Sequence, residues 1–193
     1  MSALELQSEL ELIDRARQGS VDAFEQLVLQ YQDRLYRFLL VRSANRADAE
    51  DALQEAFVAA FKYLPSYRDR YRFSTWLFTI AIRQLGRLGR QQTTHSDLPD
   101  DVACERPGPE QLGMQMQNRQ SLWQTARTCL GDSQFTALWL FYIEEMPIAE
   151  IGVTIRRPVS WVKVNLMRSR RRLSRTLQTA KPEQADSLGE VTL

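Results

Sequence analysis

Apolar residues recur at three- and four-residue steps along most of the chain, and this spacing predicts amphipathic helices. In the N-terminal half, the apolar series run over residues 24–39, 49–64 and 76–85. Pro65 is expected to end the second of these helices, because proline lacks the backbone N–H that a helix interior needs. The sequence shows no alternating pattern typical of a strand and no internal repeat. We therefore predict an all-α protein.

The helical pattern stops at residues 94–112 and resumes at residue 119. The intervening stretch, THSDLPDDVACERPGPEQL, holds three prolines and five acidic residues, a composition typical of a linker. Beyond it, Asp132 suits a helix N-cap, and Pro147 and Pro158 suit the first turns of two further helices. The predicted organisation is two small helical domains at residues 10–93 and 119–178, a flexible acidic linker at 94–118, and a disordered tail at 179–193.

The composition of the 193 residues, 44% hydrophobic and 25% charged, is typical of a globular protein. No apolar run is long enough to span a membrane, and the acidic N-terminus lacks the apolar core of a signal peptide, so we expect a cytoplasmic protein. Cys104, Cys129 and His95 are too few and too scattered for a zinc site or a Cys/His nucleophile. Phosphate-binding glycine loops and the GxSxG motif are also missing. We therefore expect no catalytic residue, no metal and no cofactor.

Charge is distributed unevenly. Residues 151–182 contain no Asp or Glu but many Arg and Lys, which is the electrostatic signature of a site for a polyanion. A short helix at 148–155, a turn and a longer basic helix at 158–173 match the helix-turn-helix, whose second helix enters the DNA major groove. A solvated basic surface on a structural helix is the alternative. Trp161 would either stack on a sugar-phosphate edge or pack inside. The other residues expected to face outward on this basic side are Arg156, Arg157, Ser160, Lys163, Val164, Met167, Arg168 and Arg171.

Residues 63–90 interleave aromatic rings with arginines. Proteins that bind single-stranded DNA combine stacking rings with a cationic groove along the backbone. Tyr67, Tyr71 and Phe73 are therefore candidates for holding unstacked bases. We expect Tyr67 and Tyr71 to be exposed and Trp76 to lie in the core. The candidate cations of this stretch are Arg68, Arg70, Arg72, Arg83, Arg87 and Arg90.

The segment ADAEDALQEAF at residues 47–57 is acidic and favours a helix. On that helix Asp48, Asp51 and Glu55 share one side, flanked by Gln54, because residues three and four apart are neighbours. Such a side is either an ordinary solvated surface or a site for a protein partner. Its occurrence with a basic, aromatic loop and a helix-turn-helix favours the second interpretation.

These segments together resemble a known family. ADAEDALQEAFVAAFKYL is similar to the core-binding signature of bacterial sigma factors, and FSTWLFTIAIRQLGRLGR to the promoter-melting segment that follows it. The stretch from LGDSQFTALWLFYIEEMPIAEIG to VKVNLMRSRRRL resembles the second conserved domain, a helix-turn-helix. With sigma-2-like and sigma-4-like domains and a short linker, the chain resembles the extracytoplasmic-function (group IV) sigma factors of the sigma-70 family. The resemblance covers residues 12–92 and 119–177.

The resemblance implies a separate role for each of these segments. Asp51, Gln54 and Glu55, with Asp48 on the same side, would bind core RNA polymerase. The loop at residues 65–73 would capture a flipped base of the promoter −10 element, and the helix-turn-helix residues would read the −35 element. The acidic linker would thread toward the polymerase active centre. Members of this group are commonly held by an anti-sigma factor, whose docking surface we place at apolar residues around Leu27, Tyr31 and Phe135.

Two other functions compete with this one. A helix-turn-helix transcriptional regulator with a helical sensor domain would bind duplex DNA alone, but it leaves the acidic helix and residues 63–90 unexplained. A helical adaptor without a DNA function conflicts with the acid-free span. A sigma factor that acts without nucleotide hydrolysis accounts for all three regions.

Overall fold

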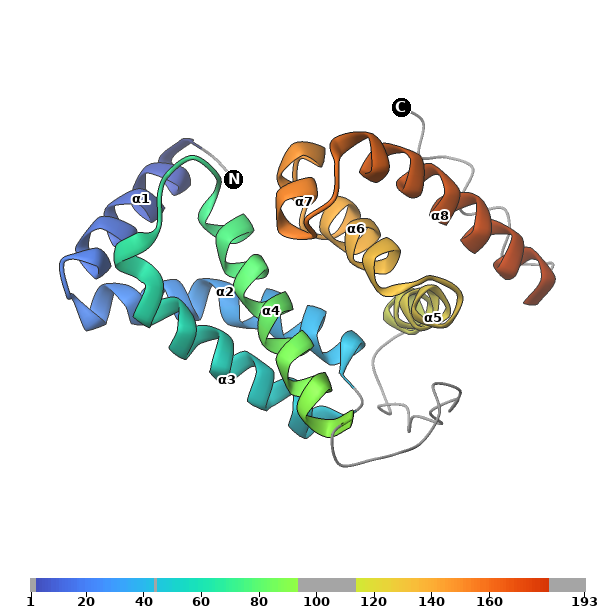
Figure 1. Ribbon diagram of the computed structural model, residues 1–193, viewed down its shortest axis with the longest axis horizontal. Helices are drawn as coiled ribbons and strands as arrows, with labels where there is room; N and C mark the ends of the chain where they lie inside the picture. The colour runs from blue at the N-terminus through green and yellow to red at the C-terminus, as the bar shows by residue number, and fades with distance from the viewer. Residues whose placement is uncertain (1–2, 44, 94–113, 181–193) are drawn as a thin grey trace. The chain divides into compact units, whose positions relative to one another are not determined.

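The computed structural model describes residues 3–43, 45–93 and 114–180, all as helices and their connections, without a strand in those ranges. The chain divides into two compact units, Met1–Arg106 and Pro107–Leu193. The helices of the first unit are α1 (Ala3–Arg17), α2 (Val21–Arg42), α3 (Arg46–Tyr63), the short 3-10 helix η1 (Leu64–Ser66) and α4 (Phe73–Thr93). Those of the second are α5 (Met114–Cys129), α6 (Asp132–Tyr142), α7 (Ile148–Thr154) and α8 (Val159–Ala180) (Figure 1). The predicted linker lies outside the described residues except where α5 begins at Met114, and the predicted tail does so except for the end of α8.

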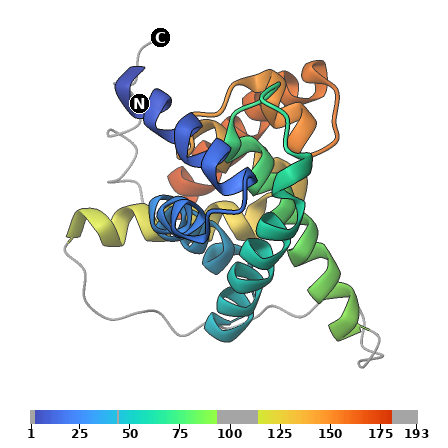
Figure 2. The same cartoon turned by 90° about the vertical axis from the view of Figure 1, so that its left-hand side faces the viewer.

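In the first unit, α3 packs against both α2 and α4 (Figures 1 and 2). The side of α3 that faces its neighbours is lined by fully buried alanines, whose small side chains let the helices approach closely. From α2 comes a row of large apolar residues, and Phe38 meets Phe78 of α4 edge to face with 5.3 Å between ring centroids. Each such buried side chain stabilises the fold by about 1.5–3 kcal/mol. Ala49, Ala52 and Ala56 of the acidic segment therefore belong to the core, while its acids lie outside.

Helix α1 is held to α2 by a buried polar contact. The hydroxyl of Tyr31 donates a hydrogen bond to the carboxylate of Glu9, and both side chains are buried. Burial, followed by this hydrogen bond, raises the pKa of Tyr31, so the hydroxyl stays neutral and keeps donating. Because α1 begins at Ala3, the helical part of the first unit starts upstream of residue 10, the predicted start of this domain.

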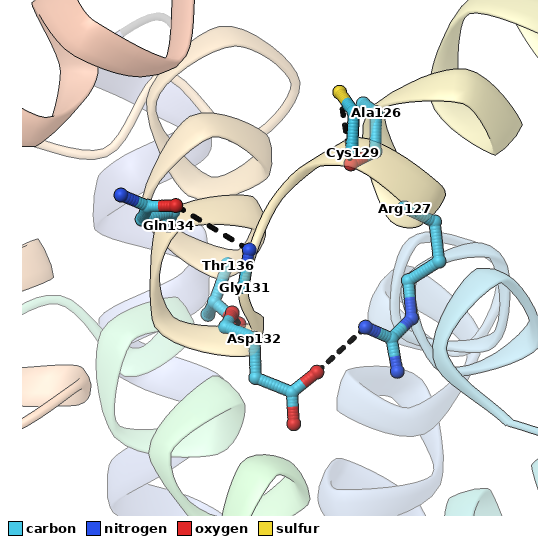
Figure 3. A network of polar contacts seen from close by, with 7 residues as sticks. All are labelled: Ala126, Arg127, Cys129, Gly131, Asp132, Gln134 and Thr136. Carbon is cyan, nitrogen blue, oxygen red and sulfur yellow. Dashed lines mark hydrogen bonds and ion pairs between the residues drawn. The ribbon is translucent and has the colours of Figure 1, made fainter. Parts of the chain in front are cut away.

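In the second unit, α6 supplies an almost fully buried run from Phe135 to Leu140, which packs against α8. The sequence prediction that Asp132 caps α6 is wrong, because Gly131 is the N-cap and Asp132 is the first helical residue. The carboxylate of Asp132 instead pairs with Arg127 at the end of α5, with 2.6 Å between Oδ1 and Nη1 (Figure 3). This ion pair spans the sharp connection between α5 and α6.

The turn between α7 and α8 is closed by two backbone hydrogen bonds. The N–H of Arg157 donates to the carbonyl of Gly152 at 2.9 Å, and the N–H of Arg156 donates to the carbonyl of Val153 at 3.3 Å. Arg156 has a φ of 54°, the left-handed conformation that completes a Schellman motif. A Cβ on Gly152 would lie 2.8 Å from the carbonyl oxygen of Arg157. This turn therefore requires glycine at position 152.

Replacing Gly152 by alanine is expected to destabilise the second unit by about 1–3 kcal/mol, because the added methyl group meets the backbone carbonyl of Arg157 in a turn that two hydrogen bonds close. Gly86→Ala in α4 is the matched control, since nothing lies within 4 Å of a Cβ there. Alanine favours a helix more than glycine does, so this control should be as stable as the parent or more so. Urea unfolding followed by circular dichroism measures both. Equal stability of the two variants would contradict the close approach at Gly152.

Candidate functional site

The acidic side of α3 does project from the first unit. Asp51 and Gln54 are exposed, whereas Asp48 and Glu55 are half-buried. Asp48 is engaged at the start of the helix, where its N–H donates to Asn45 Oδ1 at 2.8 Å and its carboxylate accepts from Asn45 Nδ2 at 3.1 Å. Such reciprocal bonds cap a helix N-terminus. Asp51 and Gln54 are therefore the members of this side that project furthest into solvent.

Glu55 forms an ion pair with Arg87 of α4, with 2.9 Å between Oε2 and Nη2. Both side chains are about half exposed, and ion pairs of this kind contribute only ~0–1 kcal/mol to stability. The pair joins a residue of the predicted polymerase surface to one of the predicted DNA surface. The two residues are 32 positions apart, so no helical periodicity could have indicated that they meet.

The loop after η1 does not present the rings that the sequence indicated. The prediction that Tyr67 is exposed is wrong, because its side chain is 2% exposed, and Phe73 is 3% exposed. The two rings lie edge to face at 5.6 Å, and Phe73 also contacts Tyr31 at 5.4 Å. The hydroxyl of Tyr67 donates to the carbonyl of Tyr71 at 2.8 Å. Burying a tyrosine ring is favourable when its hydroxyl forms a hydrogen bond. Tyr67 and Phe73 therefore form the buried support of the loop.

Trp76 is the ring of this cluster that remains partly accessible. It was expected in the core and is half-buried, with Tyr67 at 5.3 Å and Phe73 at 5.4 Å on its inner side. Arg72 lies directly before α4, and residues 72, 76 and 83 follow steps of four and seven, which place them on one side of the helix. Arg72, Arg83 and Arg87 are exposed. A half-exposed indole thus lies in a row of guanidinium groups, and Arg90, predicted to continue this row, lies outside the described side chains.

The remaining loop cations are held close to the loop itself. The guanidinium of Arg68 donates to the carbonyls of Tyr67 at 3.1 Å and Pro65 at 3.4 Å. Arg70 lies over the half-buried ring of Tyr71, 5.5 Å from its centroid. Both guanidinium groups belong to exposed residues, so their charge reaches solvent beside the row on α4.

On α8 the predicted outward side is exposed. Apolar Val164 and Met167 are 40% and 48% exposed. Trp161, which the sequence left undecided, is half-buried, and the guanidinium of Arg157 lies 5.3 Å from its ring centroid. The other members of this exposed side are Arg156, Arg157, Ser160, Lys163, Arg168 and Arg171.

Two further observations were not available from the sequence pattern. Asn165, in the middle of this basic helix, is buried, with Gln134 of α6 as a hydrogen-bond partner at 2.9 Å. The docking surface suggested around Leu27, Tyr31 and Phe135 is wrong, because all three side chains are at most 1% exposed and form the cores of the two units. Apolar periodicity indicates the inside of a helix and carries no separate signal for a docking surface.

Comparisons with known proteins agree with this arrangement. The family model described as Sigma-70 region 2 matches residues 27–94, which span α2 to α4. The ECF RNA polymerase sigma factor SigW of Bacillus subtilis (strain 168) is 28% identical over 178 residues, covering 86% of this chain and 95% of the relative. Two solved structures share the fold. That of CnrH in complex with the cytosolic domain of CnrY has a TM-score of 0.69 and 21% identity, covering 90% of this chain and 99% of the other. That of the sigma factor RpoE in complex with the anti-sigma factor NepR from Bartonella quintana has a TM-score of 0.62 and 22% identity, covering 83% and 100%.

None of the described helices combines the length and the apolar character that crossing a membrane requires. The ECF RNA polymerase sigma factor SigE of Mycolicibacterium smegmatis (strain ATCC 700084 / mc(2)155) is 31% identical over 176 residues, which cover 88% of this chain and 67% of that protein. An acidic side on α3, an arginine row on α4 and a basic helix-turn-helix occur in one chain that these relatives match over most of its length. The chain therefore belongs to the extracytoplasmic-function RNA polymerase sigma factors.

Proposed function

We propose that this sigma factor uses three separate surfaces to direct RNA polymerase to its promoters. The observation that carries the proposal is the contrast between two neighbouring helices of the first unit. Helix α3 exposes Asp51 and Gln54, whereas α4 exposes Arg83 and Arg87. A negative surface beside a positive one suits a protein that binds a protein partner and DNA at the same time.

The acidic side of α3 binds core RNA polymerase. Asp51 and Gln54 are available for direct contact because they project into solvent. Asp48 contributes by fixing the start of α3, and Glu55 reaches the partner at the expense of its ion pair with Arg87. Since exposed ion pairs are weak, this exchange costs little.

The −10 element binds along α4 and the loop before it. Trp76 is the ring placed to stack on an unpaired base, a contact that contributes ~1–3 kcal/mol. Arg72, Arg83 and Arg87 lie where a phosphate backbone would pass, with Arg68 and Arg70 beside them. Melting is driven by stacking and charge, and the protein itself catalyses no reaction.

The −35 element binds the outward side of α8 in the major groove. The exposed apolar pair Val164 and Met167 suits contact with thymine methyl groups, the apolar feature of that groove. Arg156 and Arg157 lie in the turn before the helix, and the acid-free span gives the whole side a positive potential. The acidic linker at residues 94–118 threads toward the polymerase active centre.

Lys163→Ala and Arg168→Ala are each expected to weaken binding to a −35 duplex by about 1–3 kcal/mol, because each removes an exposed cation from the DNA-facing side. Binding to a single-stranded −10 oligonucleotide should not change, which serves as the internal control. A variant that loses affinity equally on all sequences, with a shallower salt dependence, has lost a phosphate contact. If both variants bind −35 DNA as the parent does, this side of α8 is not the reading surface.

The protein also has an anti-sigma partner, in our proposal. One of the similar structures is a sigma factor bound to its anti-sigma factor, and release of such a partner would control when this chain meets polymerase in the cytoplasm.

Run-off transcription with purified core enzyme tests the proposed function as a whole. We expect initiation at selected promoters only when both core enzyme and this protein are present. A helix-turn-helix regulator would instead bind promoter duplex alone and leave the specificity of the core enzyme unchanged. Initiation from no member of a promoter library would contradict the proposal.

A further inference from the structure

A chain of hydrogen bonds, exposed at Gly131 and part-buried at Asn165, connects α6 to the first turn of α8. The N–H of Gly131 donates to Gln134 Oε1 at 3.3 Å, as Figure 3 shows. Gln134 Nε2 donates to Asn165 Oδ1 at 2.9 Å, and Asn165 Nδ2 donates to the carbonyl of Trp161 at 2.9 Å. Asn165 is 7% exposed, so both ends of its amide are used inside the protein.

The two ends of this chain fix its direction. A backbone N–H only donates and a carbonyl oxygen only accepts, whereas an amide side chain does both. The carbonyl of Trp161 therefore requires the nitrogen of Asn165, and the oxygen of Asn165 then requires the nitrogen of Gln134. The oxygen of Gln134 is left for Gly131, which supplies an N–H. A single orientation of the two amides satisfies every group. We call Gly131, Gln134, Asn165 and Trp161 the amide relay.

The far end of the amide relay lies beside DNA-facing groups. Trp161 carries the guanidinium of Arg157 on its ring at 5.3 Å, and the N–H of Arg157 is bound to Gly152. Arg157 is thus held by its backbone in the turn and by its side chain on the ring of Trp161, the residue whose backbone carbonyl accepts from Asn165. Ser160 and Val164, neighbours of Trp161 on the same helix, are exposed. An error in the placement of this first turn would displace all of these groups together.

We propose that Gln134 and Asn165 are positioning residues for −35 recognition, which act by fixing the first turn of α8 without touching DNA. The inference rests on the proposed function of α8 as the −35 reading helix. It also explains why an amide side chain occupies an inward position of a helix whose charged residues are exposed. A leucine at position 165 would fill the space but would not orient the turn.

The test uses the double variant Gln134→Met, Asn165→Leu in reconstituted holoenzyme. Removing both amides leaves no side-chain donor or acceptor of the relay buried without a partner, so the variant should fold with nearly the parental stability. The ratio of affinities for a consensus and a mutated −35 element should fall about three- to tenfold, the range expected when one or two oriented contacts are lost. The slope of affinity against salt should stay the same, because no cation is removed.

Ser169→Ala is the matched control. Ser169 lies one turn further along α8, is 1% exposed, and its Oγ has no hydrogen-bond partner among the described residues. This variant should keep both the stability and the affinity ratio of the parent. Single variants at 134 and 165 complete a cycle, in which the loss of the double variant should be smaller than the sum of the single losses.

An unchanged affinity ratio in the folded double variant would overturn the inference, as would an equal loss of affinity on both −35 sequences. Failure of the proposed function looks different, because the parent holoenzyme would then show no −35 preference at all. The unfolding free energy is measured for each variant alongside the affinities. A lower ratio at unchanged unfolding free energy supports a positioning role over a structural one.

Discussion

Replacing Asp51 by lysine is expected to weaken association with core RNA polymerase by at least about a hundredfold. Reversing a charge at a complementary interface costs several kcal/mol, and each 1.4 kcal/mol is a factor of ten in affinity. Asp51 is exposed and takes part in no ion pair or cap among those found on α3. The variant should therefore fold as the parent does. Co-purification with core enzyme and run-off transcription measure the effect.

Glu11→Lys provides the matched control for Asp51→Lys. Glu11 is an exposed acid on α1, so this substitution makes the same change in net charge on the same unit. Its association with core enzyme should be close to that of the parent. Glu55 is less suitable for reversal, because a lysine there would also repel Arg87, its partner on α4. If Asp51→Lys co-purifies with core enzyme as well as the parent does, the assignment of α3 to the polymerase interface is wrong.

Trp76→Leu is expected to lower the affinity of the holoenzyme for a single-stranded −10 oligonucleotide by about 1–3 kcal/mol, the contribution of one aromatic stack. Leucine keeps an apolar contact to Tyr67 and Phe73, so the loop should retain its support. The half-exposed face of the indole, which lies in the arginine row, is what the substitution removes. Fluorescence anisotropy with a labelled oligonucleotide gives the affinity.

Binding of the same holoenzyme to a −35 duplex is the internal control for Trp76→Leu, since we propose that this duplex contacts the other unit. Tyr67→Phe is the companion variant, because it keeps a buried ring and loses only the hydrogen bond to the Tyr71 carbonyl. It should affect the −10 strand less than Trp76→Leu does. If Trp76→Leu binds the −10 strand as the parent does, the indole is a core residue and another group captures the base.

The sequence was sufficient for features that depend on helical periodicity. The apolar series at residues 24–39 and 49–64 correspond to α2 and α3, and the outward residues of α8, such as Lys163 and Arg168, are exposed as predicted. Periodicity works there because each helix has one buried side and one solvated side. The acidic side of α3 was found in the same way.

Other features depend on contacts that local sequence does not encode. Tyr67 lies in a loop, where no repeating pattern distinguishes an exposed ring from one that folds back onto Phe73. The pairing of Glu55 with Arg87, and of Gln134 with Asn165, requires knowing which helices are neighbours and in what register. Asn165 shows the limit most clearly. No pattern along the basic helix indicated that Asn165 is buried, and only the packing against α6 reveals it.

At Arg156, with its left-handed conformation, selection for stability and selection for DNA binding favour different residues. A residue other than glycine in this conformation is strained by roughly 1–2 kcal/mol, and glycine would relieve that strain. Glycine would also delete a positive charge from the turn that leads into α8. A laboratory screen that selected for thermal stability alone would favour glycine at position 156. The selected variants would be more stable but would bind promoter DNA less tightly.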